Sequence, residues 1–150
     1  SLSFTDQLGL MWSAFWQEIN TPSDFSGDPY GELTNQCAHT FFGLILAGIY
    51  CLASLVWFGE FPHKEVAGIV VTLPYLLGEV FEQRWRGWDT VADVFFYGIG
   101  GYGLLASLSE VVIDDVAYLE AHPIGFGVSF GAFLAVLYVR LRVRVKQKYG

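Results

Sequence analysis

Charged residues are scarce in this 150-residue sequence, at 15%, whereas soluble domains carry about 25%. Basic residues are scarcer still, since eight Lys and Arg stand against fifteen Asp and Glu. The formal net charge of -7, with no basic cluster before residue 140, argues against a nucleic-acid partner. In contrast, 53% of the residues are hydrophobic, and a chain this small has too much surface for its volume to bury them in one core. We therefore expect lipid to be the solvent and the chain to be a membrane protein.

Cysteine and histidine are also few. Cys37 and Cys51 are the two cysteines, and on one helix they would lie about 21 Å apart, too far for a disulfide. This spacing excludes a secreted protein held together by disulfides. Of the three histidines, His39 is predicted at the opposite membrane face from His63 and His122, so no pair can hold a haem between two axial ligands. The sequence assigns no metal site and leaves any cofactor unknown.

Long apolar stretches dominate what is present. A helix needs roughly 20 apolar residues to cross a ~30 Å hydrocarbon layer, and four stretches approach that length. They are residues 38–58, 66–81, 91–108 and 124–139. The last follows Pro123, which suits the first turn of a helix.

The N-terminal region, residues 1–37, is predicted as an amphipathic helix and a connecting loop. Leu8, Met11, Trp12 and Phe15 share one face of residues 4–19 at helical spacing, which is typical of a helix lying in the membrane interface. The two prolines and two glycines of residues 20–36 predict the loop. We expect a single-domain, all-α membrane protein with four transmembrane helices and this interfacial helix.

Basic residues near span ends stay in the cytoplasm, and this rule orients the chain. Arg84 and Arg86 lie between the second and third spans, and the tail 140–150 holds five more basic residues. Both regions are therefore predicted inside, with both termini cytoplasmic. The acidic 110–120 segment is predicted as an outer loop.

Small residues predict where helices approach closely. A stripe runs along the fourth span at Gly127, Gly131 and Ala135, and the third span holds a glycine-rich run at residues 98–103. We predict that spans three and four pack against each other there, through Gly98, Gly100, Gly101, Gly103, Gly127, Gly131 and Ala135.

The polar stretch between the second and third spans carries the candidate functional residues. Ionisable groups at membrane depth are costly unless paired, so they usually face the bundle interior or a wet cavity. Helical spacing brings the carboxylates and arginines of this stretch to one side, near the histidine that opens the first span. The sequence predicts a polar cytoplasmic-side pocket lined by His39, Glu79, Glu82, Gln83, Arg84, Arg86, Asp89 and Asp93.

Three interpretations of this pocket are open. An Arg–carboxylate clasp would fix the turn, whereas a recognition pocket would use Arg84 or Arg86 to hold a phosphate or carboxylate headgroup. A metal-dependent enzyme would instead hold a divalent cation through Asp89 and Asp93, helped by Glu79 and His39. Two aspartates at i and i+4 are a weak signal, and the sequence has no serine elbow and no His-Glu-x-x-His motif.

The same residues resemble the VanZ-like family of small bacterial membrane proteins of the cell envelope. In that family a histidine near the start of a span precedes aromatic and small residues, and a later hairpin carries Glu, Gln, Arg and Asp before a glycine-rich stretch. The corresponding positions are residues 36–43, then Glu79, Gln83, Arg86, Asp89 or Asp93, and residues 98–103. The match is partial, because the family's lysine before the histidine is missing and an aromatic residue replaces its asparagine. The resemblance implies an envelope function with no settled reaction.

These features together predict a non-catalytic protein of the bacterial cytoplasmic (inner) membrane. Its pocket would bind an anionic lipid or envelope-precursor headgroup, which makes membrane lipids the expected partners. One alternative is an accessory or structural subunit of a larger membrane complex, with other membrane subunits as partners. Another is a metal-dependent membrane lipid hydrolase or transferase.

Overall fold

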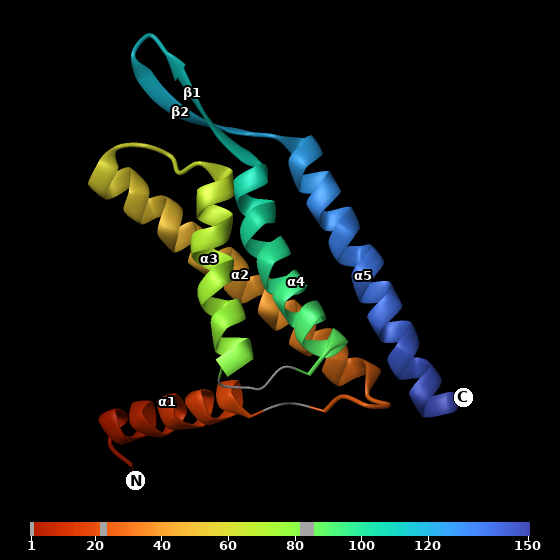
Figure 1. Ribbon diagram of the computed structural model, residues 1–150. Helices are drawn as coiled ribbons and strands as arrows, with labels where there is room; N and C mark the ends of the chain where they lie inside the picture. The colour runs from red at the N-terminus through yellow and green to blue at the C-terminus, as the bar shows by residue number, and fades with distance from the viewer. Residues whose placement is uncertain (1, 22–23, 82–85) are drawn as a thin grey trace.

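The computed structural model describes residues 2–21, 24–81 and 86–150. Within them the chain is mostly helical, with an antiparallel hairpin between the last two helices. The elements are α1 (Phe4–Asn20), α2 (Pro29–Phe58), α3 (Lys64–Phe81), α4 (Trp88–Ala106), β1 (Leu108–Ile113), β2 (Val116–Ala121) and α5 (Pro123–Tyr149). Helices α2 to α5 form a bundle, α1 lies across one end of it, and the hairpin projects from the other (Figure 1). We call these two ends the base and the hairpin end.

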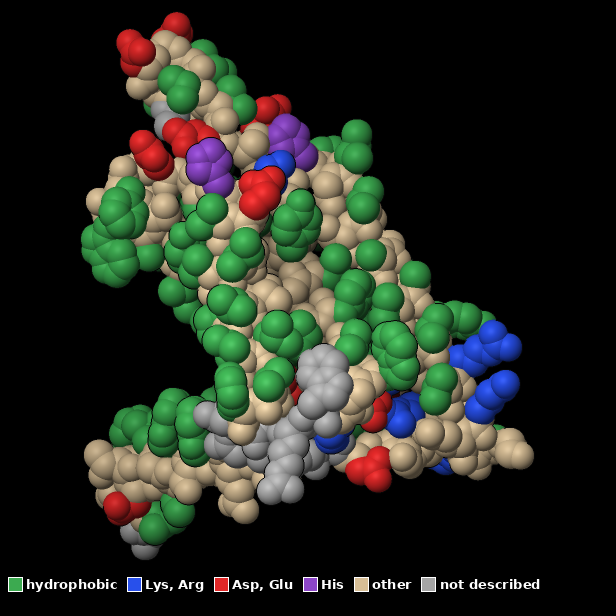
Figure 2. Space-filling model, in the orientation of Figure 1, with side chains coloured by type: hydrophobic (Ala, Val, Ile, Leu, Met, Phe, Trp, Pro, Cys, Tyr) green, Lys and Arg blue, Asp and Glu red, His purple; other side chains and the backbone are tan. Residues whose placement is uncertain are grey.

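Two of the described helices, α2 and α5, are long and apolar enough to cross a membrane by length and composition. Helices α3 and α4 are shorter and carry charged residues, so the four expected spans are met only in part. Large apolar side chains cover much of the described surface, as the green atoms along the bundle show (Figure 2). Trp57, for example, is 76% exposed. This surface is consistent with a membrane protein.

Helix α2 begins nine residues earlier than expected, so residues 29–36 are helix and not loop. The Asp28 side chain caps it by accepting a hydrogen bond from the backbone N–H of Gly31 at 2.9 Å. Pro29 occupies the first turn, where its missing N–H costs nothing. Pro29 and Gly31, which were among the residues that predicted a loop, therefore lie in the first turn of a helix. At the other end, helix α5 continues through the basic tail to Tyr149.

The chain is mostly helical, so the all-α expectation is confirmed coarsely, but residues 108–121 form a β-hairpin and the expected loop here is wrong. Six residue pairs join β1 to β2, from Leu108 opposite Ala121 to Ile113 opposite Val116. The two turn residues, Asp114 and Asp115, have φ of 51° and 61°, which is the backbone of a type I′ turn. The β-branched residues around this Asp-Asp pair are the sequence signal for the hairpin.

Glycine at the second turn position is expected to stabilise the hairpin. Asp115→Gly removes a side chain from a left-handed backbone position, which should raise the free energy of unfolding by about 0.5–1 kcal/mol. Asp115→Val should lower it, because a β-branched residue resists positive φ. Hydrogen exchange of the β1 and β2 amides would measure both effects, and equal protection in the two variants would contradict the assignment of the turn.

Helix α4 is central, and it packs against α2, α3 and α5. Phe96 on α4 is fully buried between α2 and α5, whereas Tyr97 contributes to a second core cluster with α2 and α3. The hairpin end is tied together by the backbone N–H of Phe61, which donates to the Glu110 carboxylate at 3.0 Å. The two clusters of buried residues around α4 thus hold α2, α3 and α5 together.

The small residues pack differently from the prediction. A Cβ on Gly100 would collide with the backbone carbonyl of Thr40 on α2, and a Cβ on Gly43 would collide with that of Tyr97 on α4. The close approach is therefore between α2 and α4, with Gly101 in the same contact, while Gly98 lies near Thr72 of α3. Gly103 does face α5, near Ser129. Gly127 and Gly131 face open space and Ala135 is exposed, so these positions do not form the predicted packing face.

Candidate functional site

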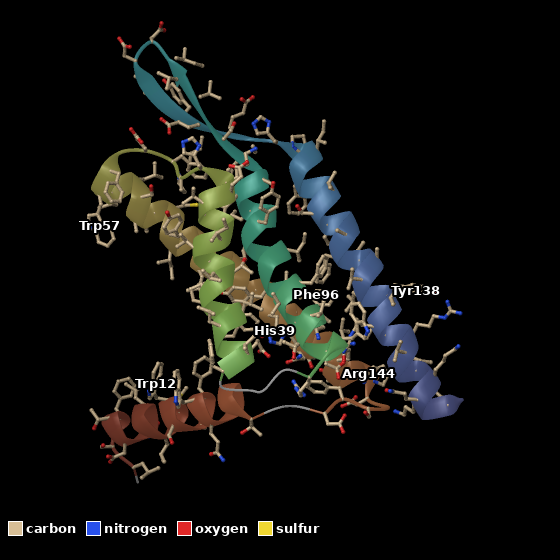
Figure 3. The ribbon with its side chains drawn as sticks, in the orientation of Figure 1. Trp12, His39, Trp57, Phe96, Tyr138 and Arg144 are labelled. Carbon is tan, nitrogen blue, oxygen red and sulfur yellow. The ribbon has the colours of Figure 1, made fainter. Side chains whose placement is uncertain are left out.

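Polar and charged side chains gather at the base, contributed by four helices. Glu32, Gln36 and His39 lie on one face of α2 at helical spacing, and Asp89 and Asp93 do the same on α4. Arg140 and Arg144 lie one turn apart near the end of α5. Figure 3 shows His39 and Arg144 at this end, away from the hairpin. The charged side chains at the base fall into two adjoining groups, and most of them are buried or partly buried.

The first group is a network of two carboxylates and two guanidinium groups, which we call the clasp (Glu32, Asp89, Arg140 and Arg144). Arg140 Nε donates to Glu32 Oε1 at 2.8 Å, and Arg144 Nε donates to Glu32 Oε2 at 2.8 Å. Asp89 Oδ1 accepts hydrogen bonds from Nη2 of both arginines. Since Glu32 is 0% exposed, its charge is stabilised by these two partners instead of by water. The clasp joins α2, α4 and α5.

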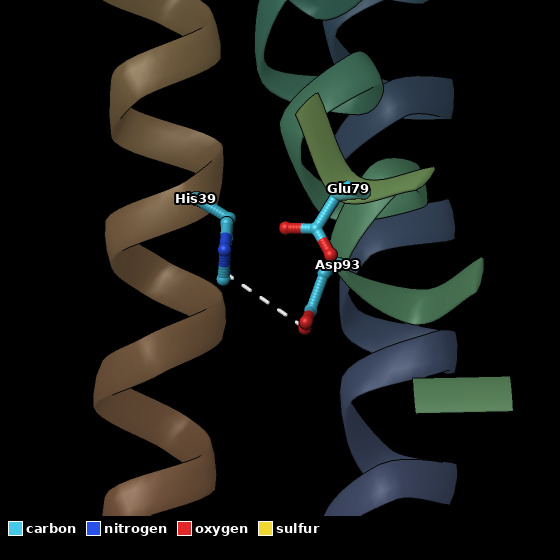
Figure 4. Close-up of side chains that lie close together, drawn as sticks. All are labelled: His39, Glu79 and Asp93. Carbon is cyan, nitrogen blue, oxygen red and sulfur yellow. Dashed lines mark ion pairs between the residues drawn. The ribbon is translucent and has the colours of Figure 1, made fainter. Parts of the chain in front are cut away.

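The second group is the His39 triad (His39, Glu79 and Asp93), one residue each from α2, α3 and α4 (Figure 4). One ligand-type atom from each of the three side chains lies within 4.8 Å of the other two. Glu79 is 2% exposed and Asp93 5% exposed. His39 Nδ1 is 3.9 Å from Asp93 Oδ1. Two buried carboxylates and an imidazole thus face one another at the level of the clasp.

Neighbouring amides orient two members of the triad. Gln36 Nε2 donates to Asp93 Oδ1 at 2.7 Å and to Glu32 Oε1 at 3.0 Å, so it links the triad to the clasp. His39 Nδ1 lies 2.9 Å from the backbone carbonyl of Asn35. Because a carbonyl can only accept, Nδ1 carries a proton, which leaves Nε2 as the ring nitrogen outside this bond.

Two buried oxygens beside the triad have no hydrogen-bond partner among the described residues. They are Oε2 of Glu79 and Oε1 of Gln36. The Tyr75 hydroxyl lies beside the Glu79 carboxylate as a donor that a small shift of the side chain would pair with it. The Tyr75 ring stacks on Tyr97 at 4.3 Å between centroids and meets His39 edge-on. Aromatic rings therefore wall the triad on the side of α3.

Arg86 lies at the margin of the triad, just before α4. Its Nη2 is 3.9 Å from Asp93 Oδ2, and its side chain is 27% exposed. Its backbone N–H donates to Thr90 Oγ1 at 3.0 Å, so Thr90 fixes the chain at the start of α4. The Arg86 side chain thus reaches both the buried triad and the surface of the base.

The structure brings together four of the predicted pocket residues, His39, Glu79, Arg86 and Asp93. Asp89 turns instead towards α5 and belongs to the clasp, so it does not face the triad. Three further predicted residues, Glu82, Gln83 and Arg84, lie outside the described residues.

Sequence reasoning missed four residues that complete the base: Glu32, Gln36, Arg140 and Arg144. Glu32 and Gln36 precede His39 by seven and three positions, which is the spacing that continues a helix face backwards from the first span. Arg140 and Arg144 are four apart, which is also a one-face spacing. Both signals were present but were assigned to a loop and to a basic tail.

In the clasp, two negative charges face two positive charges. The triad, in contrast, has more hydrogen-bond acceptors than donors. A neutral imidazole and two carboxylates are ligands that borderline divalent metal ions accept. Among the described residues of the base, His39 bonds to a backbone carbonyl and not to a serine or cysteine nucleophile. Comparison with protein-family models, with curated proteins and with solved structures finds no match to the chain.

Proposed function

We propose that this chain is a multi-pass protein of the bacterial cytoplasmic membrane, with α2 to α5 as four membrane helices. Helices α3 and α4, of 18 and 19 residues, would each extend about 27–29 Å at 1.5 Å per residue, close to the ~30 Å hydrocarbon layer. They run beside the two longer helices (Figure 1). Ile69 and Leu73 on α3 are 62% and 46% exposed, which supports contact with lipid.

The distribution of charge supports an orientation with the base in the cytoplasm. Acidic side chains gather at the hairpin end and basic ones at the base (Figure 2). Of the basic residues that the structure describes, Lys64 alone belongs to the hairpin end. Since positive residues flanking spans remain inside, the base and both chain termini would face the cytoplasm. Helix α1 would then lie in the inner interface, with Trp12 and Trp16 stacked on each other among the lipid headgroups.

The function we propose is binding of an anionic lipid or envelope-precursor headgroup at the base. The observation that carries it is the position of the exposed basic side chains. Arg142, Lys146 and Lys148 are exposed on the last turns of α5, at the end of the bundle that α1 crosses. Arg86 is partly exposed at the same end. A headgroup phosphate at this level would meet cationic groups held by a rigid base, because the clasp fixes the end of α5.

Anionic lipid bound to the purified protein tests this proposal. Combining Arg86→Gln, Arg142→Gln and Lys146→Gln removes three cationic groups, each worth about 1 kcal/mol at an anionic surface. Affinity for phosphatidylglycerol should then fall by about 100-fold, while affinity for phosphatidylcholine stays constant. Native mass spectrometry from a mild detergent measures both. The matched control is Lys64→Gln, which removes a basic residue at the other end.

Equal phosphatidylglycerol retention by the triple variant and by Lys64→Gln would refute headgroup binding.

The same spectra test a second candidate function, that of an accessory subunit of a larger membrane complex. The open space beside Gly127 and Gly131 favours that candidate, because small residues exposed on a membrane helix allow another helix to approach closely. Stoichiometric partner chains in place of bound lipid would support it.

The resemblance to the VanZ-like family remains part of this proposal. The residues that carry the resemblance include His39, Glu79 and Asp93, which come from three different helices and lie together in the triad. Their convergence supports a common site at these positions and an envelope role.

A further inference from the structure

The His39 triad has the composition of a divalent metal site. Its imidazole and two carboxylates come from three helices that the core holds in place. Three protein ligands of this kind leave coordination positions open to water or to an exogenous ligand. A divalent cation would also offset the two buried negative charges, which are costly in a bundle interior.

The hydrogen bonds around the triad match those of a metal-binding histidine. Metal-ligating histidines usually donate the second ring N–H to a backbone carbonyl or carboxylate, which sets the tautomer and ring orientation. His39 Nδ1 makes such a bond to the Asn35 carbonyl at 2.9 Å. With Nδ1 engaged in this way and lying 3.9 Å from Asp93 Oδ1, Nε2 is the ring nitrogen that would ligate a metal ion.

A second, independent observation is the pair of unpartnered oxygens. Gln36 is 1% exposed, and its amide orientation is fixed because Nε2 donates to both Glu32 and Asp93. Its Oε1 has no partner among the described residues. Oε2 of Glu79, which is 2% exposed, also makes no hydrogen bond there, with the Tyr75 hydroxyl as the donor beside it. Buried acceptors without donors are unfavourable. A hydrated cation in the triad would satisfy Glu79 directly and could reach the amide oxygen through a bound water.

We propose that His39, Glu79 and Asp93 bind one divalent metal ion of the zinc or manganese class. Mixed nitrogen and oxygen ligation favours these ions over calcium and magnesium, which take oxygen ligands. Asp89 is not a ligand, because the clasp arginines engage its carboxylate. This site goes beyond the proposed headgroup binding and does not depend on it, since Arg142, Lys146 and Lys148 lie on the surface of α5 and only Arg86 borders the triad as well.

Metal titration of the full chain tests the site. The protein is purified in mild detergent, any affinity tag is removed, and the sample is stripped with a chelator before Zn²⁺ or Mn²⁺ alone is added. We expect one ion per chain and a rise in thermal stability.

Glu79→Gln should weaken metal binding by about 100-fold or more. It should leave the stability of the metal-free protein unchanged or raise it, because the substitution removes a buried charge and keeps the shape of the side chain. Co²⁺ should give a visible absorption band that His39→Gln shifts or abolishes.

His63→Gln is the matched control, since His63 is an exposed histidine at the hairpin end. It should bind the metal as the unaltered chain does. Equal affinity in the Glu79→Gln and unaltered proteins would overturn the proposal, as would the absence of stoichiometric binding in the unaltered protein. Anionic lipid retention is measured on the same samples. Loss of metal binding with normal lipid retention, or the reverse, therefore separates the two proposals.

Discussion

Glu32→Gln is expected to lower the free energy of unfolding by about 3–5 kcal/mol. The substitution leaves the guanidinium groups of Arg140 and Arg144 without the carboxylate that both of them contact at 2.8 Å. Both arginines are largely buried, with side chains 14% and 7% exposed. Asp89 would then be the one carboxylate in the clasp facing two arginines, so one buried positive charge is left uncompensated. Such a charge costs more than the original ion pair contributes. Unfolding in mixed detergent micelles measures the loss.

The control is Glu60→Gln, which removes an exposed carboxylate at the hairpin end and should change stability by less than about 0.5 kcal/mol. Adding Arg144→Met to Glu32→Gln should restore part of the lost stability, because the uncompensated charge is removed along with its partner. If Glu32→Gln and Glu60→Gln had equal effects, the clasp would contribute nothing to the fold.

Gly43→Ala should destabilise the bundle by about 2–3 kcal/mol, at the upper end of the cost of overpacking. The added Cβ would collide with the backbone carbonyl of Tyr97, and backbone atoms at a helix crossing cannot move aside as a flexible side chain can. The loss should occur although alanine favours helix over glycine by about 1 kcal/mol. Because His39 is one turn away on α2 and Asp93 one turn away from Tyr97 on α4, separation of the helices should also open the triad.

Gly127→Ala serves as the matched control, because its Cβ would meet open space. It should leave stability unchanged or raise it by up to about 1 kcal/mol. The comparison uses the same detergent unfolding measurement, with the same substitution in a helix interior. A loss at Gly127 as large as that at Gly43 would mean that the close contact between α2 and α4 is not what limits the fold.

The helices were predictable from the sequence, because an apolar stretch of this length rarely forms anything other than a helix. Convergence of His39, Glu79 and Asp93 was also predictable, since ionisable groups on membrane helices are expected to face each other. The start of α2 was not, because glycine and proline near Asp28 indicate a loop and a helix start equally well. The hairpin at residues 108–121 is hard to predict because its acidic residues are typical of a loop, whereas its β-branched residues favour strands.

The partners of the clasp could not be predicted from local patterns. Glu32 and Arg140 are 108 positions apart, and no periodicity within either helix specifies the other. Snorkelling to the interface is the usual behaviour of arginines that end a membrane helix. Arg142 does point outward, whereas Arg140 and Arg144 point inward. Only the crossing of α2, α4 and α5 at the base decides which arginines become buried.

The clasp also sets an order of events during biosynthesis. Its two carboxylates are on α2 and α4, which emerge from the ribosome before the α5 arginines that neutralise them. Until α5 is made, Glu32 and Asp89 have no guanidinium partner in the clasp, so the partly synthesised bundle carries unbalanced acid at the base. Closure of the base therefore waits for the last helix.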